Sequence, residues 1–172
     1  MRKIFLALLG FLFVFTIFSK AYAEKAEVEF VDAQGNKIGK ATLSQEEQGV
    51  RLSIDVSDLK PGSHGIHIHS VGKCEPPDFK SAGSHFNPSS KKHGLKSKEG
   101  PHVGDLPNLI VAEDGKSKTE WILQNASLTE GPDSLLKPEG TAIVIHESAD
   151  DEQTDPAGNS GARVACGVIA KV

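Results

Sequence analysis

Two histidines alternate with two isoleucines in the segment Gly65-Ile66-His67-Ile68-His69. If this segment is a strand, His67 and His69 project from one face about 7 Å apart along the chain, while the isoleucines face the core. Two imidazoles that lie side by side can converge on one metal ion. Surface or core histidines explain an isolated H-x-H pair about as often as a ligand pair does, so the pair needs support from the rest of the sequence.

A second set of candidate ligands lies in one loop-like stretch and comprises His85, His93, His102 and Asp105. Three imidazole nitrogens and one carboxylate give the four ligands that a closed tetrahedral zinc site uses. The chain must fold back on itself to bring them together. Because surface loops often carry scattered histidines, this set alone is also a weak signal.

His146 ends the alternating segment 142–146 and can reach the face that carries His67 and His69 if the two strands are near each other. A nitrogen-rich site suits copper, whereas the set with a carboxylate suits zinc. Together the two sites use six of the seven histidines, which chance scattering does not predict. We interpret the seventh, His64, as a neutral histidine hydrogen-bonded to backbone; a further ligand is the alternative.

Short apolar segments with a period of two predict the strands that must position these ligands. The clearest is 50–56, in which Val, Leu, Ile and Val alternate with Arg, Ser and Asp. Asp114-Gly115 predicts a hairpin turn between the fifth and sixth strands. About eight strands are expected, around residues 28–30, 38–43, 50–56, 65–70, 109–112, 121–123, 142–146 and 164–169.

Two stretches, 71–107 and 147–162, are rich in Gly, Pro, Ser, Asn and charge and have no periodic apolar face. Loops of this length in a compact domain are usually functional or disordered. Metal ligands and a cysteine in the first loop favour order. The sequence therefore predicts an all-β sandwich or flattened barrel with two long ordered loops.

The chain begins with Arg2, Lys3, an apolar run at 4–18 and the small-x-small pattern Ala21-Tyr22-Ala23, which are typical of a secretory signal peptide at 1–23. A retained anchor helix is the alternative, although the apolar run is shorter than a bilayer span. Residues 24–172 suit one domain. This segment carries a formal charge of −7, because the three basic residues at 1–23 are removed, and its acidity argues against nucleic-acid partners and anionic membranes.

Cys74 and Cys166 are the only cysteines, and an exported chain reaches an oxidising compartment. We therefore expect one disulfide between them. A reactive or metal-binding thiol pair is the alternative, but it favours a closer spacing such as C-x-x-C.

The motifs resemble those of the copper–zinc superoxide dismutase family, in the same order along nearly the whole segment 24–172. The resemblance implies an eight-stranded antiparallel Greek-key β-barrel. The matching motifs are Gly65-Ile66-His67-Ile68-His69, Ala82-Gly83-Ser84-His85-Phe86-Asn87-Pro88, His93-Gly94, His102-Val103-Gly104-Asp105-Leu106, His146-Glu147, Asp150-Asp151, Gly158-Asn159-Ser160-Gly161, Arg163 and Ala165-Cys166-Gly167-Val168-Ile169.

The resemblance also implies one copper and one zinc per subunit. His85 would bridge the two ions after losing both ring protons, which only two adjacent cations make reasonable. Copper would be held by His67, His69, His85 and His146, and zinc by His85, His93, His102 and Asp105.

In this family superoxide is converted to dioxygen and hydrogen peroxide by a copper that changes oxidation state. The resemblance implies that His85 carries a proton, that Arg163 attracts the anion, and that Asp150 links a copper-bound to a zinc-bound imidazole; Asp151 we interpret as a solvated loop acid. Only Glu152 to Ala157 separate Asp151 from Gly158, where well-known animal members carry a longer electrostatic loop. We therefore expect reduced or relocated electrostatic steering.

Two other functions remain as alternatives: a non-catalytic copper-binding module on the same fold, and a structural sandwich with incidental histidines. The expected partner is superoxide, with no nucleic acid and no stable membrane insertion once the signal is removed. A monomer and a homodimer both agree with the sequence. Export could end in the periplasm, at the cell surface or outside the cell.

Overall fold

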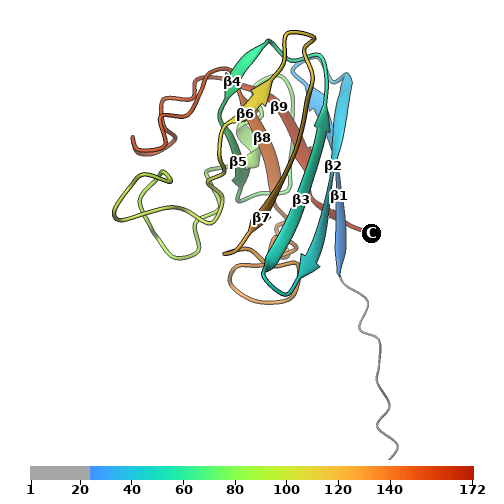
Figure 1. Ribbon diagram of the computed structural model, residues 1–172. Coiled ribbons are helices and arrows are strands. Elements are labelled where there is room, and N and C mark those ends of the chain that lie inside the picture. The colour runs from blue at the N-terminus through green and yellow to red at the C-terminus, as the bar shows by residue number, and fades with distance from the viewer. Residues whose placement is uncertain (1–23) are drawn as a thin grey trace, which may run out of the picture.

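The computed structural model describes residues 24–172, so the signal peptide expected at 1–23 lies outside the described part. The described chain consists of strands and loops, with one short 3-10 helix, η1 (Lys80–Ala82) (Figure 1). No helix in residues 24–172 is long and apolar enough to cross a membrane. The all-β prediction is confirmed.

One antiparallel sheet of eight strands curls into a half-barrel, with strand order β5-β8-β9-β1-β2-β3-β7 and β10 beside β1 (Figure 1). A separate two-stranded sheet pairs β4 with β6. The strands are β1 (Lys25–Asp32), β2 (Lys37–Glu46), β3 (Gly49–Val56), β4 (Gly62–His64), β5 (Ile66–His69), β6 (Leu109–Val111), β7 (Ser117–Leu123), β8 (Ala142–His146), β9 (Arg163–Val168) and β10 (Ala170–Lys171).

The core follows from the alternation of side chains along the strands. In β1, Ala26, Val28 and Phe30 are buried while the residues between them are exposed. Large side chains from β1, β2, β3, β5 and β8 meet inside the half-barrel, and each fully buried one contributes roughly 1.5–3 kcal/mol through removal from water. This core supports β5 and β8, the two strands that carry the candidate ligands His67, His69 and His146.

One expectation about the strands is incomplete and one is wrong: β5 confirms the strand expected at 65–70 but not as the first strand of this region, and the expected hairpin is absent. The strand expected at 65–70 is preceded by a separate strand, because the chain changes partner at Gly65: β4 pairs with β6, whereas β5 pairs with β8. A tight turn is present at Asp114-Gly115, but β6 and β7 do not form a hairpin ladder, since β7 pairs with β3 instead. A third long loop, 124–141, also connects β7 to β8.

The two long loops expected from the sequence, 71–107 and 147–162, are ordered. Both lie on the side of the molecule that carries β4, β5 and β6, away from β1–β3 (Figure 1). All candidate ligands outside β5 and β8 come from the first of these loops.

Candidate metal centre

Strands β5 and β8 bring three histidines together. His67 lies opposite Val144 and His69 opposite Ala142, while the backbone N–H of His146 donates to the carbonyl of Gly65 at 2.8 Å. The ring centroids of His67 and His146 are 4.8 Å apart. The isoleucines of β5 face the main core, as expected, so the histidines occupy the opposite face.

The first long loop covers the free edge of β5 and thereby adds His85. The N–H of Phe86 donates to the carbonyl of Ile68, and the N–H of Ile68 donates to the carbonyl of Gly104, both at 2.8 Å. A Cβ on Gly104 would lie 2.2 Å from the Ile68 oxygen, so only glycine permits this approach. The loop backbone therefore places His85 beside His69 and Asp105 beside His67.

Four imidazoles converge at this point, with ligand atoms that all lie within 4.8 Å of one another: His67, His69, His85 and His146. All four rings are buried. Each has one nitrogen without any hydrogen-bond partner, and these four atoms are the only buried side-chain nitrogens or oxygens in residues 24–172 that lack one. Buried polar atoms normally have partners, so four orphan nitrogens in one place indicate a ligand that they would bind.

The other nitrogen of each ring is held in place by the protein. Nδ1 of His69 faces the carbonyl of Gly83 at 2.9 Å, and Nδ1 of His146 faces the carbonyl of Gly161 at 3.2 Å. Each of these nitrogens donates to its oxygen, which leaves the lone pair on Nε2. In His67 the roles of the two ring nitrogens are reversed: Nε2 faces the carboxylate of Asp150, and Nδ1 has no hydrogen-bond partner.

A second cluster forms around the carboxylate of Asp105. Its Oδ1 lies 2.9 Å from Nδ1 of His85, 3.0 Å from Nδ1 of His93 and 3.1 Å from Nδ1 of His102. Its Oδ2 accepts the backbone N–H groups of Gly94 and His102. The three nitrogens of the expected set thus lie within 3.1 Å of one carboxylate oxygen, and His85 takes part in both clusters. The group whose ligand atoms all lie within 4.8 Å of one another contains His67 in place of His102.

Burial and hydrogen bonding keep His69, His85, His146 and Asp105 in the protonation states that metals require. Burial and the nearby His67 lower the pKa of His146 to about 3, and burial lowers the pKa of His85 to about 4. Burial and the nearby His85 hold the pKa of His69 well below its ordinary value. Burial alone would raise the pKa of Asp105, but hydrogen bonds from His85, Gly94 and His102 outweigh it and hold the pKa below its usual range. Neutral imidazoles and an ionised carboxylate are the ligand forms of these residues.

The donor sets fit copper and zinc. Four imidazoles with converging free nitrogens suit copper, and three imidazoles with one buried carboxylate suit tetrahedral zinc. The fit rests on the four orphan nitrogens and on the convergence at Asp105.

Comparison with known proteins agrees with this donor chemistry. A family model described as copper/zinc superoxide dismutase matches residues 37–169. The chain belongs to this family. It is 47% identical to superoxide dismutase [Cu-Zn] 1 of Aquifex aeolicus over 95% of this chain and 96% of that protein. It is 35% identical to superoxide dismutase [Cu-Zn] of Escherichia coli over 98% and 99% of the two chains.

Solved structures of copper/zinc superoxide dismutase-like proteins share the fold. The crystal structure of a SOD-like protein from Bacillus subtilis has a TM-score of 0.81 at 41% identity, covering 83% of this chain and 96% of that one. The metals of this family are copper and zinc, which agrees with the donor sets described above.

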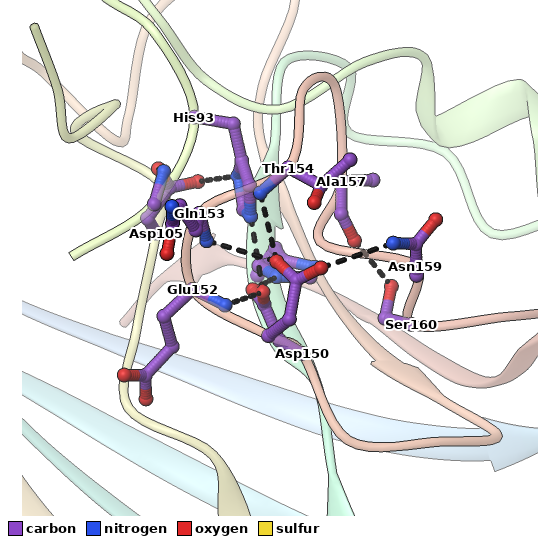
Figure 2. Close-up of polar contacts among 12 residues, drawn as sticks. His93, Asp105, Asp150, Glu152, Gln153, Thr154, Ala157, Asn159 and Ser160 are labelled. Carbon is purple, nitrogen blue, oxygen red and sulfur yellow. Dashed lines mark hydrogen bonds and ion pairs between the residues drawn. The ribbon is translucent and has the colours of Figure 1, made fainter. Parts of the chain in front are cut away.

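In this family member, Asp150 connects the two clusters. Its Oδ2 lies 2.7 Å from Nε2 of His67. Its Oδ1 lies 3.1 Å from Nε2 of His93 (Figure 2). Figure 2 shows His93 between Asp105 and Asp150, so both nitrogens of the ring face a carboxylate. The neighbouring Asp151 is exposed, as expected, but it also organises the loop by accepting the N–H groups of Gln153 and Thr154.

Arg163, at the start of β9, is aimed by backbone oxygens. Its guanidinium donates to the carbonyls of Phe79 and Gly83, each at 2.7 Å. The Gly83 carbonyl is also the partner of His69, so the arginine and a candidate copper ligand share one anchoring atom. The disulfide expected between Cys74 and Cys166 is present and anchors the segment that supplies these carbonyls.

His64 has the backbone partners that the sequence interpretation gave it. Its ring nitrogens each lie 2.7 Å from a carbonyl oxygen, that of His146 and that of Lys60. It belongs to neither ligand cluster of the described residues.

The contacts of three residues around the clusters were not anticipated from the sequence, although Gly158 belongs to a matching motif. Asn108 binds the backbone of Asp150 through both ends of its amide, at 2.8 and 2.7 Å. Asp155 accepts the backbone N–H of His93 at 2.7 Å. Gly158 has a φ of +60°, and a Cβ there would lie 1.6 Å from Oδ1 of Asp150. The motif Gly158-Asn159-Ser160-Gly161 is the one sequence signal that points to this region.

Proposed function

We propose that this chain is an exported superoxide dismutase. Two superoxide anions and two protons give one dioxygen and one hydrogen peroxide. The four buried orphan nitrogens of His67, His69, His85 and His146 carry the proposal, since they form a prepared nitrogen-rich site beside a carboxylate-centred one. Membership of the copper/zinc superoxide dismutase family supports the activity.

We assign copper to His67, His69, His85 and His146, and zinc to His85, His93, His102 and Asp105. Bound copper supplies the one-electron chemistry, whereas zinc has a single oxidation state and supplies structure. His85 is placed to serve both sites, because its Nδ1 points to the Asp105 cluster and its Nε2 is free in the other. The free Nε2 is the atom at which His85 would take up and return a proton.

Arg163 is the residue that would attract the anionic substrate. Its guanidinium is held by carbonyl oxygens rather than by a carboxylate, so hydrogen bonding fixes its direction without cancelling its charge. This local charge opposes the repulsion from the acidic segment 24–172, which has a formal charge of −7.

Export is supported by the disulfide, which persists in oxidising compartments, and by the signal-like segment 1–23. The bacterial relatives favour the periplasm as the destination, with residues 24–172 as the mature domain. Superoxide is the expected partner.

The test is a dismutase assay on protein reconstituted with copper and zinc, with metal content measured by elemental analysis. The wild type should hold one copper and one zinc and be active, whereas His69→Ala should lose copper and activity and keep zinc. Equal activity in the two proteins would contradict the copper assignment. Full metal content without activity in the wild type would favour the non-catalytic copper-binding module instead.

A further inference from the structure

The second long loop, 147–162, contacts the cluster around Asp105 through the backbone of His93, which supplies no candidate ligand atom. Asp155 lies in this loop, and its Oδ1 accepts the backbone N–H of His93 at 2.7 Å. Its Oδ2 lies 3.0 Å from Nζ of Lys92, the residue before His93. One carboxylate therefore holds both the backbone of His93 and the side chain next to it.

The backbones of the two loops are in direct contact around this point. The N–H of Lys96 donates to the carbonyl of Glu152 at 2.9 Å, and their side chains form an ion pair at 3.0 Å. Gly94 has a φ of +104°, and a Cβ there would lie 2.1 Å from the Glu152 oxygen. Residues 92–96 are thus packed against 152–155 without space for a side chain at Gly94.

This contact fixes His93 at two ends. Asp155 holds its backbone amide, and Asp150, from the same loop, faces its ring at Nε2. The remaining nitrogen, Nδ1, is directed at Asp105. A ring held at its backbone and at one nitrogen has little freedom to turn its other nitrogen away from a metal, which is how partners of metal-bound histidines raise metal affinity.

We propose that Asp155 is a positioning residue for the zinc ligand His93, and that its hydrogen bond to the His93 amide slows the release of zinc. The proposal rests on the zinc assignment made under the proposed function. The hydrogen-bond acceptor is the part that matters, and the ion pair with Lys92 is a minor contributor because it is exposed.

The test measures zinc release from copper- and zinc-loaded protein into excess 4-(2-pyridylazo)resorcinol, followed by the colour of the chelate. Asp155→Ala removes the acceptor, Asp155→Asn keeps an amide oxygen in its place, and Lys92→Gln removes only the ion pair. Asp114→Ala is the matched control, because Asp114 also accepts a backbone N–H and pairs with a lysine but lies in the turn between β6 and β7, with none of its contacts to a candidate ligand.

We expect Asp155→Ala to release zinc about ten times faster than the wild type, at the lower end of the effect seen when a partner of a metal ligand is removed. Asp155→Asn and Lys92→Gln should stay within about threefold of the wild type, and Asp114→Ala should match it. A rate for Asp155→Ala within threefold of the wild type would overturn the proposal, as would Asp155→Asn releasing zinc as fast as Asp155→Ala. A wild type that takes up no zinc would instead contradict the proposed function.

Discussion

The carboxylate of Asp150 decides which nitrogen of His67 is free. Its Oδ2 accepts a hydrogen bond from Nε2 at 2.7 Å, so the lone pair of this ring lies on Nδ1, whereas the other three rings of the cluster leave Nε2 free. The same carboxylate contacts His93 in the second cluster. The orientation of one ring in the proposed copper site is therefore tied to a ring in the proposed zinc site.

Replacing Asp150 with alanine should weaken metal binding at both sites. Loss of a carboxylate partner of metal-bound histidines typically costs 10–100-fold in affinity, and here one change removes the partner of His67 and of His93. Metal content after dialysis against a chelator is the measurement. Asp151→Asn is the control, because the contacts of Asp151 are within the loop. Retention of both metals by Asp150→Ala at wild-type levels would contradict the linking role.

The metal-free protein should lose stability as the pH falls from about 6.5 toward 4. Burial lowers the pKa of His85 to about 4 and that of His146 to about 3, below the ordinary value near 6.5 that the unfolded chain shows. In this window the unfolded state binds more protons than the folded state. The free energy of unfolding therefore falls by about 1.4 kcal/mol for each histidine per unit decrease in pH.

The buried carboxylates do not act in the same window. The pKa values of Asp105 and Asp150 lie below their ordinary value near 4, so the stability that these groups add is present above that pH and is lost only below it. Urea unfolding of chelator-treated protein at pH 7.5, 5.5 and 4.5 measures the effect. An unfolding midpoint that does not fall between pH 7.5 and 4.5 would contradict the histidine contribution.

Removal of the disulfide should affect both stability and rate. Cys74 and Cys166 are 92 residues apart in sequence, and loss of a native disulfide typically costs 2–5 kcal/mol, or roughly 5–15 °C in Tm for a domain of this size. The bridge also anchors the segment whose carbonyls at Phe79 and Gly83 aim Arg163. We therefore expect the Cys74→Ala/Cys166→Ala double variant to show a lower kcat/KM at temperatures where it is fully folded.

Thermal melts and dismutase assays on metal-loaded protein give the two measurements, with circular dichroism to establish the folded range. A double variant that melts lower but keeps the wild-type kcat/KM would show that the bridge serves stability alone.

The rate should fall only shallowly with ionic strength. Arg163 should account for most of the dependence, and Arg163→Gln should lower kcat/KM about tenfold at low salt and flatten its salt response. A salt response as steep as in members with a longer second loop, or an unchanged slope in Arg163→Gln, would contradict this. We expect a shallow dependence on ionic strength because several lysines of the two long loops are paired with carboxylates: Lys80 with Asp78, Lys92 with Asp155, and Lys96 with Glu152.

The strands with strict alternation were predictable from the sequence because each has one buried and one exposed face. The segment 50–56 is an example, and it forms β3 as expected. The start of β7 at Ser117 was not anticipated, since exposed Lys118 and Glu120 lie on its polar face and hide the pattern. The exchange of partners at Gly65 could not be predicted either, because it depends on which distant strand lies nearby.

The candidate ligands were predictable because histidine is rare and this chain uses nearly all of its histidines in one place. The surrounding contacts were not, since they involve groups that every residue carries. The carbonyls of Phe79 and Gly83 hold Arg163, and a backbone N–H of His93 meets Asp155. Asn108 and Asp155 look like ordinary loop residues until the two loops are placed against each other.

The close packing at Gly158 makes a residue without a side chain part of the site. A Cβ at this position would clash with Asp150 and would also lie 2.9 Å from Nε2 of His93. Any side chain at position 158 would therefore push the carboxylate of Asp150 and the imidazole of His93 apart. Replacement of this glycine would thus imitate the loss of a ligand partner while leaving every histidine and aspartate in the sequence. A variant of this family can therefore retain a complete set of ligands and still be a poor metal protein, and its sequence would show the defect only at a glycine.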